Sequence, residues 1–161
     1  MRVITAGLAF SVLFIMLMPG PPVPGQGQTL NPANLIALNA QGQQGQFNGP
    51  HVSVNYSYVR TGGDMQLTGN VQFGMTIQAN YAGVQSFNLS LALVDARGNV
   101  LGEQGLIRSF YSNVGDTLNF NTSVAVPPQT AFMAFTYSGQ AYAAGPGSPA
   151  PINFSFSPFA D

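Results

Sequence analysis

One histidine is the first residue to consider for catalysis or metal binding. The 161-residue chain has His51 and no cysteine, so it lacks the ligand set of a typical zinc site. A Ser-His-Asp triad would have to use His51. The chain contains no Gly-x-Ser-x-Gly nucleophile elbow to supply the serine. We therefore expect His51, which follows Gly49-Pro50, to be a polar surface residue and not a catalytic one.

Four acidic side chains are the remaining candidates, and they are Asp64, Asp95, Glu103 and Asp116. Two facing carboxylates can hydrolyse a glycosidic bond, but most of these residues adjoin glycine in predicted turns. Asp is favoured in turns because its side chain hydrogen-bonds its own backbone. We predict turn structure, with no catalytic, cofactor or metal site. A calcium site at Asp95 and Asn99, completed by another loop, is the alternative, although the Asp-x-Asp-x-Asp-Gly spacing is missing.

The charge content argues against nucleic acid as a partner. Charged residues make up only 6% of the chain, against about 25% in an ordinary soluble domain. After the first residues, the basic side chains are Arg60, Arg97 and Arg108, and there is no lysine. Nucleic-acid binding needs several basic side chains on one face, because neutralised phosphates supply most of the affinity. We expect no nucleic-acid partner, and solubility must depend on Asn, Gln, Ser and Thr.

Residues 1–27 have the form of an export signal. Arg2 gives a positive start, residues 3–18 are almost entirely apolar, and a Pro-Gly-Pro-Pro cluster follows. The apolar run is shorter than the roughly 20 residues of a full membrane span. Two interpretations stay open, a cleaved signal peptide and an apolar helix that anchors the chain to the membrane. Both place the remaining chain outside the cytoplasm, in the periplasm or the extracellular space.

Residues 28–50 are rich in Gly, Gln, Asn and Pro, and we predict a linker there. The tract over residues 41–46, Gln-Gly-Gln-Gln-Gly-Gln, is uncharged and has little apolar surface to bury. Within the linker, Asn31-Pro32 resembles a helix start, and Leu35, Ile36 and Leu38 could follow it in one short helix.

From residue 51 onward, apolar and polar residues alternate, as in half-buried strands. Inward positions are predicted for alternate residues of four runs: Val52, Val54, Tyr56, Tyr58; Met65, Leu67, Val71, Phe73; Phe87, Leu89, Leu91, Leu93; and Leu118, Phe120, Thr122, Val124, Val126. Asn88, Ser90 and Ala92 are expected to face outward. Gly98 suits a hairpin turn because glycine adopts positive φ without steric cost, and Gly69 predicts a bulge or a close backbone contact. Further strands are predicted over 106–111, 131–137 and 152–156.

Short strands separated by Gly and Pro at intervals of about ten residues predict an all-β fold. Residues 51–161 are expected to form an immunoglobulin-like antiparallel β-sandwich of about seven or eight strands. The usual Cys pair and core Trp of antibody domains are absent. A small closed barrel is the alternative, because alternation reads the same in both architectures.

Residues 89–101, Leu-Ser-Leu-Ala-Leu-Val-Asp-Ala-Arg-Gly-Asn-Val-Leu, resemble the core motif of FxLYD-type domains, which are bacterial extracytoplasmic β-sandwich modules. In that family a strand ending in Phe-x-Leu-Tyr-Asp runs into a glycine turn and a second strand. Leu93, Asp95 and Gly98 fit the motif, while Leu91 replaces the Phe and Val94 replaces the Tyr. The family offers no catalytic residues, so the resemblance implies a noncatalytic exported module.

Together these features predict a noncatalytic interaction module of the bacterial cell envelope, without a cofactor, that binds another envelope protein or a surface polymer. The first alternative is a structural subunit of a surface assembly, in which copies self-associate and the 26–50 segment donates a strand to a neighbour. The second is a hydrolase that acts on polysaccharide through isolated carboxylates.

Overall fold

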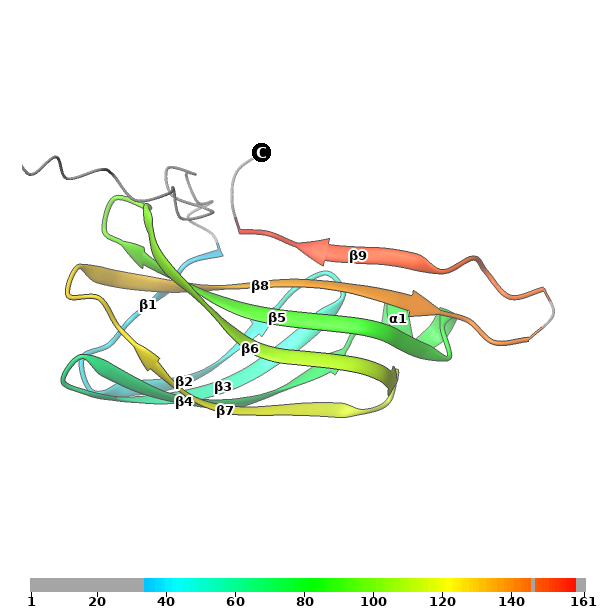
Figure 1. Cartoon of the computed structure of the whole chain (residues 1–161), viewed down its shortest axis with the longest axis horizontal. Coiled ribbons are helices and arrows are strands. Elements are labelled where there is room, and N and C mark those ends of the chain that lie inside the picture. Colours follow the sequence, from blue (N-terminus) through cyan, green and yellow to red (C-terminus); the bar gives the residue numbers. More distant parts are fainter. Residues whose placement is uncertain (1–33, 146, 159–161) are drawn as a thin grey trace, which may run out of the picture.

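Alternating side chains build two antiparallel sheets that pack face to face (Figure 1). A computed structural model describes residues 34–145 and 147–158, and the predicted leader at residues 1–27 lies outside them. The elements are β1 (Ile36–Ala37), β2 (Gly42–Asn48), β3 (Val52–Thr61), β4 (Asp64–Phe73), α1 (Met75–Asn80), β5 (Gly83–Asp95), β6 (Val100–Asn113), β7 (Thr117–Ala125), β8 (Thr130–Tyr142) and β9 (Ile152–Phe156). The all-β prediction is confirmed, and the two sheets form a sandwich.

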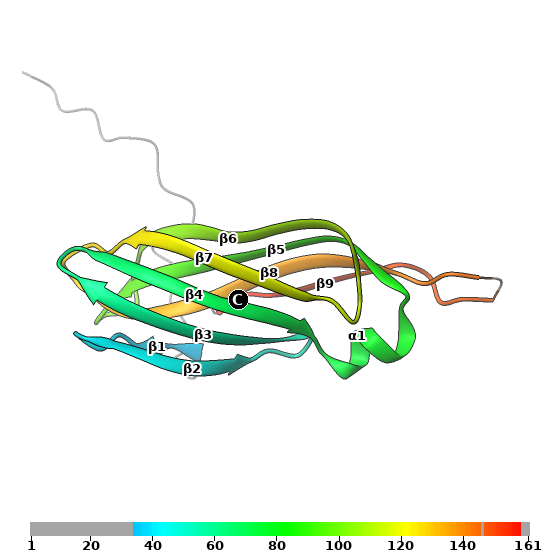
Figure 2. The ribbon, with the colours of Figure 1, turned by 90° about the horizontal axis from the view of Figure 1, so that it is seen from below.

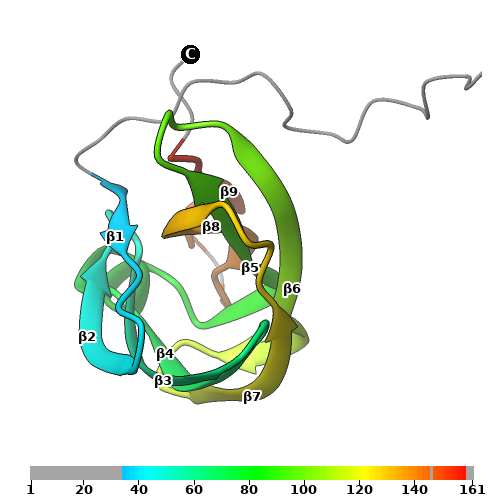
Figure 3. The ribbon, with the colours of Figure 1, turned by 90° about the vertical axis from the view of Figure 1, so that its left-hand side faces the viewer.

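The four-stranded sheet has the order β2-β3-β4-β7, and Figure 2 shows it from its outer side. The five-stranded sheet has the order β1-β8-β5-β6, and β9 also pairs with β8. Figure 3, which views the molecule from one end, shows the two layers, and the buried core side chains lie between them. The short helix α1 lies at one end of the sandwich (Figure 1) and buries Ile77 completely.

The predicted inward residues make up most of this core. Alternate residues of β3 and β5, from Val52 to Tyr58 and from Phe87 to Leu93, are buried between the sheets, as the alternation predicts. Aromatic rings fill one end of the core, where Phe87 lies edge-on to Phe73 with ring centroids 5.3 Å apart and near Phe154 at 6.4 Å. This apolar layer is what holds the two sheets together.

Ala92 departs from the prediction that it faces solvent. It lies on the outer side of the five-stranded sheet but is fully buried, in a second apolar cluster with Val94 and Val100. Leu35, just before β1, packs against this cluster together with Phe132. Ala92 therefore points outward, as the alternation predicts, but the segment that leads into β1 covers that end of the sheet.

The predicted linker over residues 28–50 is wrong for its second half. Residues 42–48 form β2, which pairs along its full length with β3, and Ile36–Ala37 form a two-residue strand on β8 in place of the short helix expected there. Phe47 is the apolar anchor of β2, with its ring 5.6 Å from that of Phe135. One large apolar residue in seven is too weak a signal to separate a strand from a polar linker.

Two glycines have the roles that the sequence predicts. Gly98 has φ of 86° in the β5–β6 turn, and its N–H donates to the carbonyl oxygen of Asp95 over 3.1 Å. Gly69 is a close contact, because a Cβ there would lie 2.3 Å from the carbonyl oxygen of Asn55. Among the residues described, no helix is both long and apolar enough to cross a membrane.

Candidate functional site

His51 lies at the start of β3, half-buried against aromatic rings, and not on the open surface as predicted. Its backbone N–H donates to the hydroxyl of Tyr137 over 3.2 Å, and its Nδ1 lies 3.3 Å from the same oxygen. Its ring is 5.4 Å from that of Phe154. Burial raises the pKa of Tyr137 to about 12, so this hydroxyl stays protonated at neutral pH. The histidine joins the end of the aromatic core to the β2–β3 connection, which is a packing role.

The four acidic side chains occupy separate parts of the fold. Asp64 begins β4 after the β3–β4 turn, Asp95 ends β5 at the β5–β6 turn, Asp116 is in the β6–β7 turn, and Glu103 lies within β6. Asp116 accepts a hydrogen bond of 2.7 Å from the backbone N–H of Asn113, within its own turn. Within residues 34–145 and 147–158, no three His, Cys, Asp or Glu side chains are grouped closely enough to hold a metal ion.

Asp95 uses its carboxylate to hold its own turn. One oxygen accepts hydrogen bonds from the backbone N–H groups of Arg97 and Asn99, each at 2.8 Å, and the other accepts from the Asn99 side chain at 2.9 Å. The Asn99 side chain, and then backbone N–H groups, hold the pKa of Asp95 below its ordinary value. The two residues of the alternative calcium site therefore bond to each other, as residues of a turn do.

Asp95→Ala is expected to lower the free energy of unfolding by less than Leu91→Ala and by more than Ser90→Ala. Because the folded-state pKa is depressed, the carboxylate stabilises the fold at neutral pH, and this contribution is lost as the pH falls below about 4. Denaturant unfolding at pH 7 and at acid pH measures the loss, which should shrink in acid. EDTA and calcium should leave the wild-type midpoint unchanged, and an EDTA-sensitive midpoint would support the calcium alternative instead.

The outer face of the four-stranded sheet carries amide and hydroxyl side chains almost without interruption. Residues paired across β2, β3, β4 and β7 alternate with the buried ones and therefore point away from the core. We call this surface the amide–hydroxyl face, and its residues are Gln44, Gln46, Asn48, Ser53, Asn55, Ser57, Gln66, Thr68, Asn70, Gln72, Asn119, Asn121 and Ser123. Val59 interrupts it with an apolar side chain that is 58% exposed, and the exposed Asp64, at the first position of β4, puts one carboxylate at its end.

Neighbouring side chains on this face bond to one another across the strands. The Asn55 amide donates to the Asn70 side-chain oxygen over 3.2 Å. The Ser53 hydroxyl donates to the Asn48 side-chain oxygen over 3.0 Å. An amide has two donor hydrogens and an acceptor oxygen, so each keeps capacity for a partner. The face is therefore a polar, uncharged surface that can both donate and accept hydrogen bonds.

Sequence reasoning predicted part of this face and missed the rest. The alternation in β3 and β7 already placed Ser53, Asn55 and Asn119 on an outward side. It does not place Gln44 and Gln46 there, because the composition of residues 41–46 predicts a linker. Comparisons of the chain with protein-family models, with curated proteins and with solved structures find no match.

Proposed function

We propose that this chain is a noncatalytic, exported interaction module of the bacterial cell envelope. Its contact surface is the amide–hydroxyl face, and its partner is an uncharged region of another envelope protein or of a surface polymer. The apolar run at residues 3–18 and the resemblance of residues 89–101 to FxLYD-type modules support export.

The observation that carries this proposal is the scarcity of charge on the outer side of the four-stranded sheet, where Asp64, at the first position of β4, is the one charged residue among the paired outward positions of the described strands. Soluble proteins are designed with about 25–35% charged residues on the surface, because these charges keep the molecules soluble and apart. Charged side chains are depleted at the centres of protein interfaces, because an unpaired charge is costly to remove from water. Amides and hydroxyls have a smaller desolvation cost and can bond to a partner's polar groups. A face of this composition is suited to contact.

We further infer an immunoglobulin-like topology for the seven strands from β3 to β9. β3, β4 and β7 pair as strands A, B and E of such a domain, and β5, β8 and β9 pair as C, F and G. β6 pairs with β5 in the place of C′. β1 and β2 are then additions before the domain, and β2 widens the face proposed for contact.

Gln72→Lys is the variant that tests this face. Gln72 is exposed on the inner strand β4, between Ser53 of β3 and Thr117 of β7. If the face meets a partner, a lysine there must be desolvated without a counter-charge, and association should weaken by about tenfold or more. The measurement is the binding of the purified full chain to washed cell envelopes, as a function of its concentration.

Gln104→Lys is the matched control, because Gln104 is also an exposed glutamine but lies on β6 of the other sheet. It adds the same charge and should leave the binding curve unchanged. In spheroplasts of cells that express the full chain, an added protease that cannot cross the inner membrane should reach the domain. Equal binding curves for both variants, or a domain that the protease cannot reach, would refute the proposal.

The edge of β2 favours a structural subunit as the second candidate. Among the described strands, β2 pairs with β3 alone. The Gly49 N–H donates to the Val52 carbonyl oxygen, so every second residue of β2, counted from Gly49, turns its backbone groups toward β3. The backbone groups of Gln44 and Gln46 therefore point to the open side. β2 has no lysine or proline of the kind that blocks edge pairing. Size-exclusion chromatography decides: oligomers that Gln44→Lys disperses support this candidate, and a monomer at all concentrations refutes it.

The hydrolase alternative has no observation in its favour. Asp95 and Asp116 accept hydrogen bonds within their own turns, and Glu103 accepts one of 3.4 Å from the Thr136 hydroxyl. A glycosidase needs two carboxylates that flank one bond. We therefore do not propose this activity.

A further inference from the structure

Two cross-strand rows of side chains lie on the outer face of the five-stranded sheet. Each row takes one residue from each of β6, β5, β8 and β9, at positions that the strand register places side by side. The first row is Arg108, Asn88, Ser138 and Ser155, and the second row is Phe110, Ser86, Gln140 and Asn153. We call these two rows the glycan strip.

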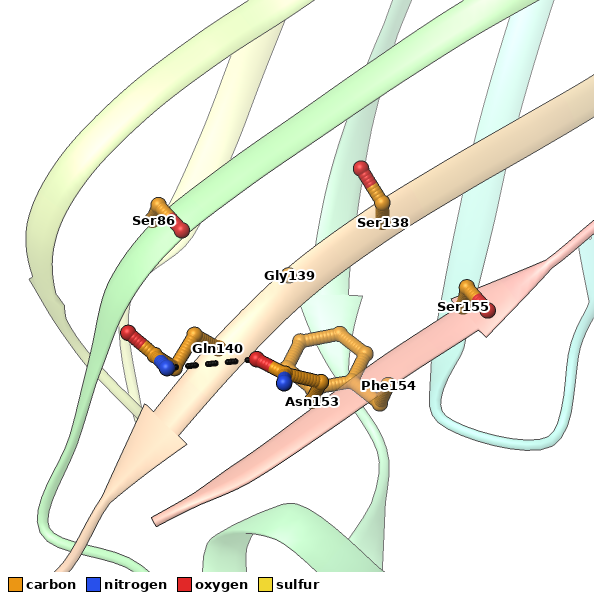
Figure 4. Close-up of a pocket in the computed structure, with 7 residues that line it drawn as sticks. All are labelled: Ser86, Ser138, Gly139, Gln140, Asn153, Phe154 and Ser155. Carbon is orange, nitrogen blue, oxygen red and sulfur yellow. Dashed lines mark hydrogen bonds between the residues drawn. The ribbon is translucent and has the colours of Figure 1, made fainter.

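The middle of the strip is hollow. A depression of about 340 Å³ is lined by side chains from β5, β8 and β9 (Figure 4). Its serines, Ser86, Ser138 and Ser155, are short, which leaves room above the sheet. Gln140 and Asn153 are longer and are fixed to each other, because the Gln140 amide donates to the Asn153 oxygen over 3.2 Å. The depression therefore presents three hydroxyl groups beside a hydrogen-bonded pair of amides.

An exposed aromatic ring stands at one end of the strip. Phe110 is 57% exposed and lies opposite Ser86 across the β5–β6 pairing. The guanidinium of Arg108 sits 5.3 Å from the centre of its ring. This contact orients the ring by a cation–π attraction. A ring held in this way, with more than half of the side chain open to solvent, is a platform on which a flat apolar surface can stack.

We infer that the glycan strip binds a neutral polysaccharide chain laid across the strands. Sugar hydroxyls both donate and accept hydrogen bonds, as the serine, asparagine and glutamine side chains of the strip do. The C–H face of a sugar ring can stack on Phe110, and the forked donors of Arg108 can reach adjacent hydroxyls. Neighbouring strands are about 4.8 Å apart, close to the length of one sugar ring in an extended glycan. Each strand can therefore contact one ring.

The strip is built to hold this ligand and not to cleave it. None of its eight residues is acidic, whereas glycoside hydrolysis requires a pair of carboxylates. It also lies on the sheet opposite to the amide–hydroxyl face, so it gives the module a second contact surface. The inference names a ligand for the proposed interaction module. It depends on the residues of the glycan strip, whereas the proposed function depends on those of the amide–hydroxyl face.

Phe110→Ala tests the inference in affinity electrophoresis. The purified full chain is run in native gels that contain dextran, amylose or a linear β-glucan, and polygalacturonate is the charged comparison. At least one neutral glucan should slow the wild type. Phe110→Ala should weaken this binding by about fivefold to tenfold, the range expected for one aromatic stacking contact. Tyr111→Ala is the matched control, since Tyr111 is 74% exposed and belongs to neither row, and it should bind as the wild type does.

Ser138→Leu gives an independent test, because Ser138 is exposed and a leucine there fills the depression without entering the core. It should also abolish the retardation while the thermal unfolding midpoint stays close to that of the wild type. The inference is overturned if no neutral glucan slows the wild type, if polygalacturonate binds more tightly, or if Phe110→Ala binds as Tyr111→Ala does. Gln72→Lys should leave glucan binding unchanged, so failure of this inference is distinguishable from failure of the proposed function.

Discussion

Leu91→Ala is expected to lower the free energy of unfolding by about 2–5 kcal/mol. Leu91 is fully buried in β5, where it lies between Gln104 of β6 and Phe135 of β8. Truncation removes its transfer free energy and leaves a cavity, which a strand paired on both sides closes only in part. Denaturant unfolding of the full chain, followed by circular dichroism in the far ultraviolet, measures the change.

Ser90→Ala is the control for this prediction, because Ser90 is the preceding residue of the same strand and faces away from the core. Its expected cost is below about 0.5 kcal/mol. If the two variants unfold at the same denaturant concentration, Leu91 is not a core residue, and the register of β5 described above is wrong.

Gly69→Ala is the second large effect, with an expected loss of about 1–3 kcal/mol from overpacking. The added Cβ would lie 2.3 Å from the carbonyl oxygen of Asn55 and 2.5 Å from the Phe120 ring. The ring can turn away, but the carbonyl belongs to the backbone of the paired strand β3. β3 and β4 must therefore separate locally, and the cost appears as a lower midpoint in thermal or denaturant unfolding.

The matched control for Gly69 is Gly102, also within a strand but with open space where its Cβ would lie. Gly102→Ala should change stability by no more than about 0.5 kcal/mol. A Gly102→Ala protein as destabilised as Gly69→Ala would show that the loss comes from the backbone, and not from the contact with Asn55.

The strands that carry large apolar residues at every second position could be predicted from the sequence. β3 and β5 alternate clearly, and the Asp95-to-Asn99 turn was visible from its glycine and its capping carboxylate. β2 could not be predicted, because its stability depends on pairing with β3 and on Phe47, and neither is visible in a stretch of Gln and Gly. Pairing between strands is a tertiary property that local composition does not encode.

The candidate surfaces were harder to predict than the strands. Polar outward residues follow from alternation, but the residues beside them depend on register between strands far apart in the chain. Ser86 meets Gln140 in the sheet although more than fifty residues separate them. Phe110 lies opposite Ser86 because β5 and β6 pair with two register shifts, at Leu89/Ser90 and at Leu93/Val94. These shifts are not visible in the sequence. The polar character of the outward side was therefore predictable for the strands that alternate clearly, and the arrangement of the two faces was not.

The proposed function requires that the amide–hydroxyl face touch a partner in the cell envelope. Position-specific photo-cross-linking tests this most directly, with a photoreactive phenylalanine analogue in place of Gln72 in one full-length protein and in place of Gln104 in another. Both positions are exposed, and they lie on different sheets. Irradiation of intact cells should give a discrete adduct from position 72 and none from position 104. Equal adducts from both positions, or an adduct from position 104 alone, would contradict the claim.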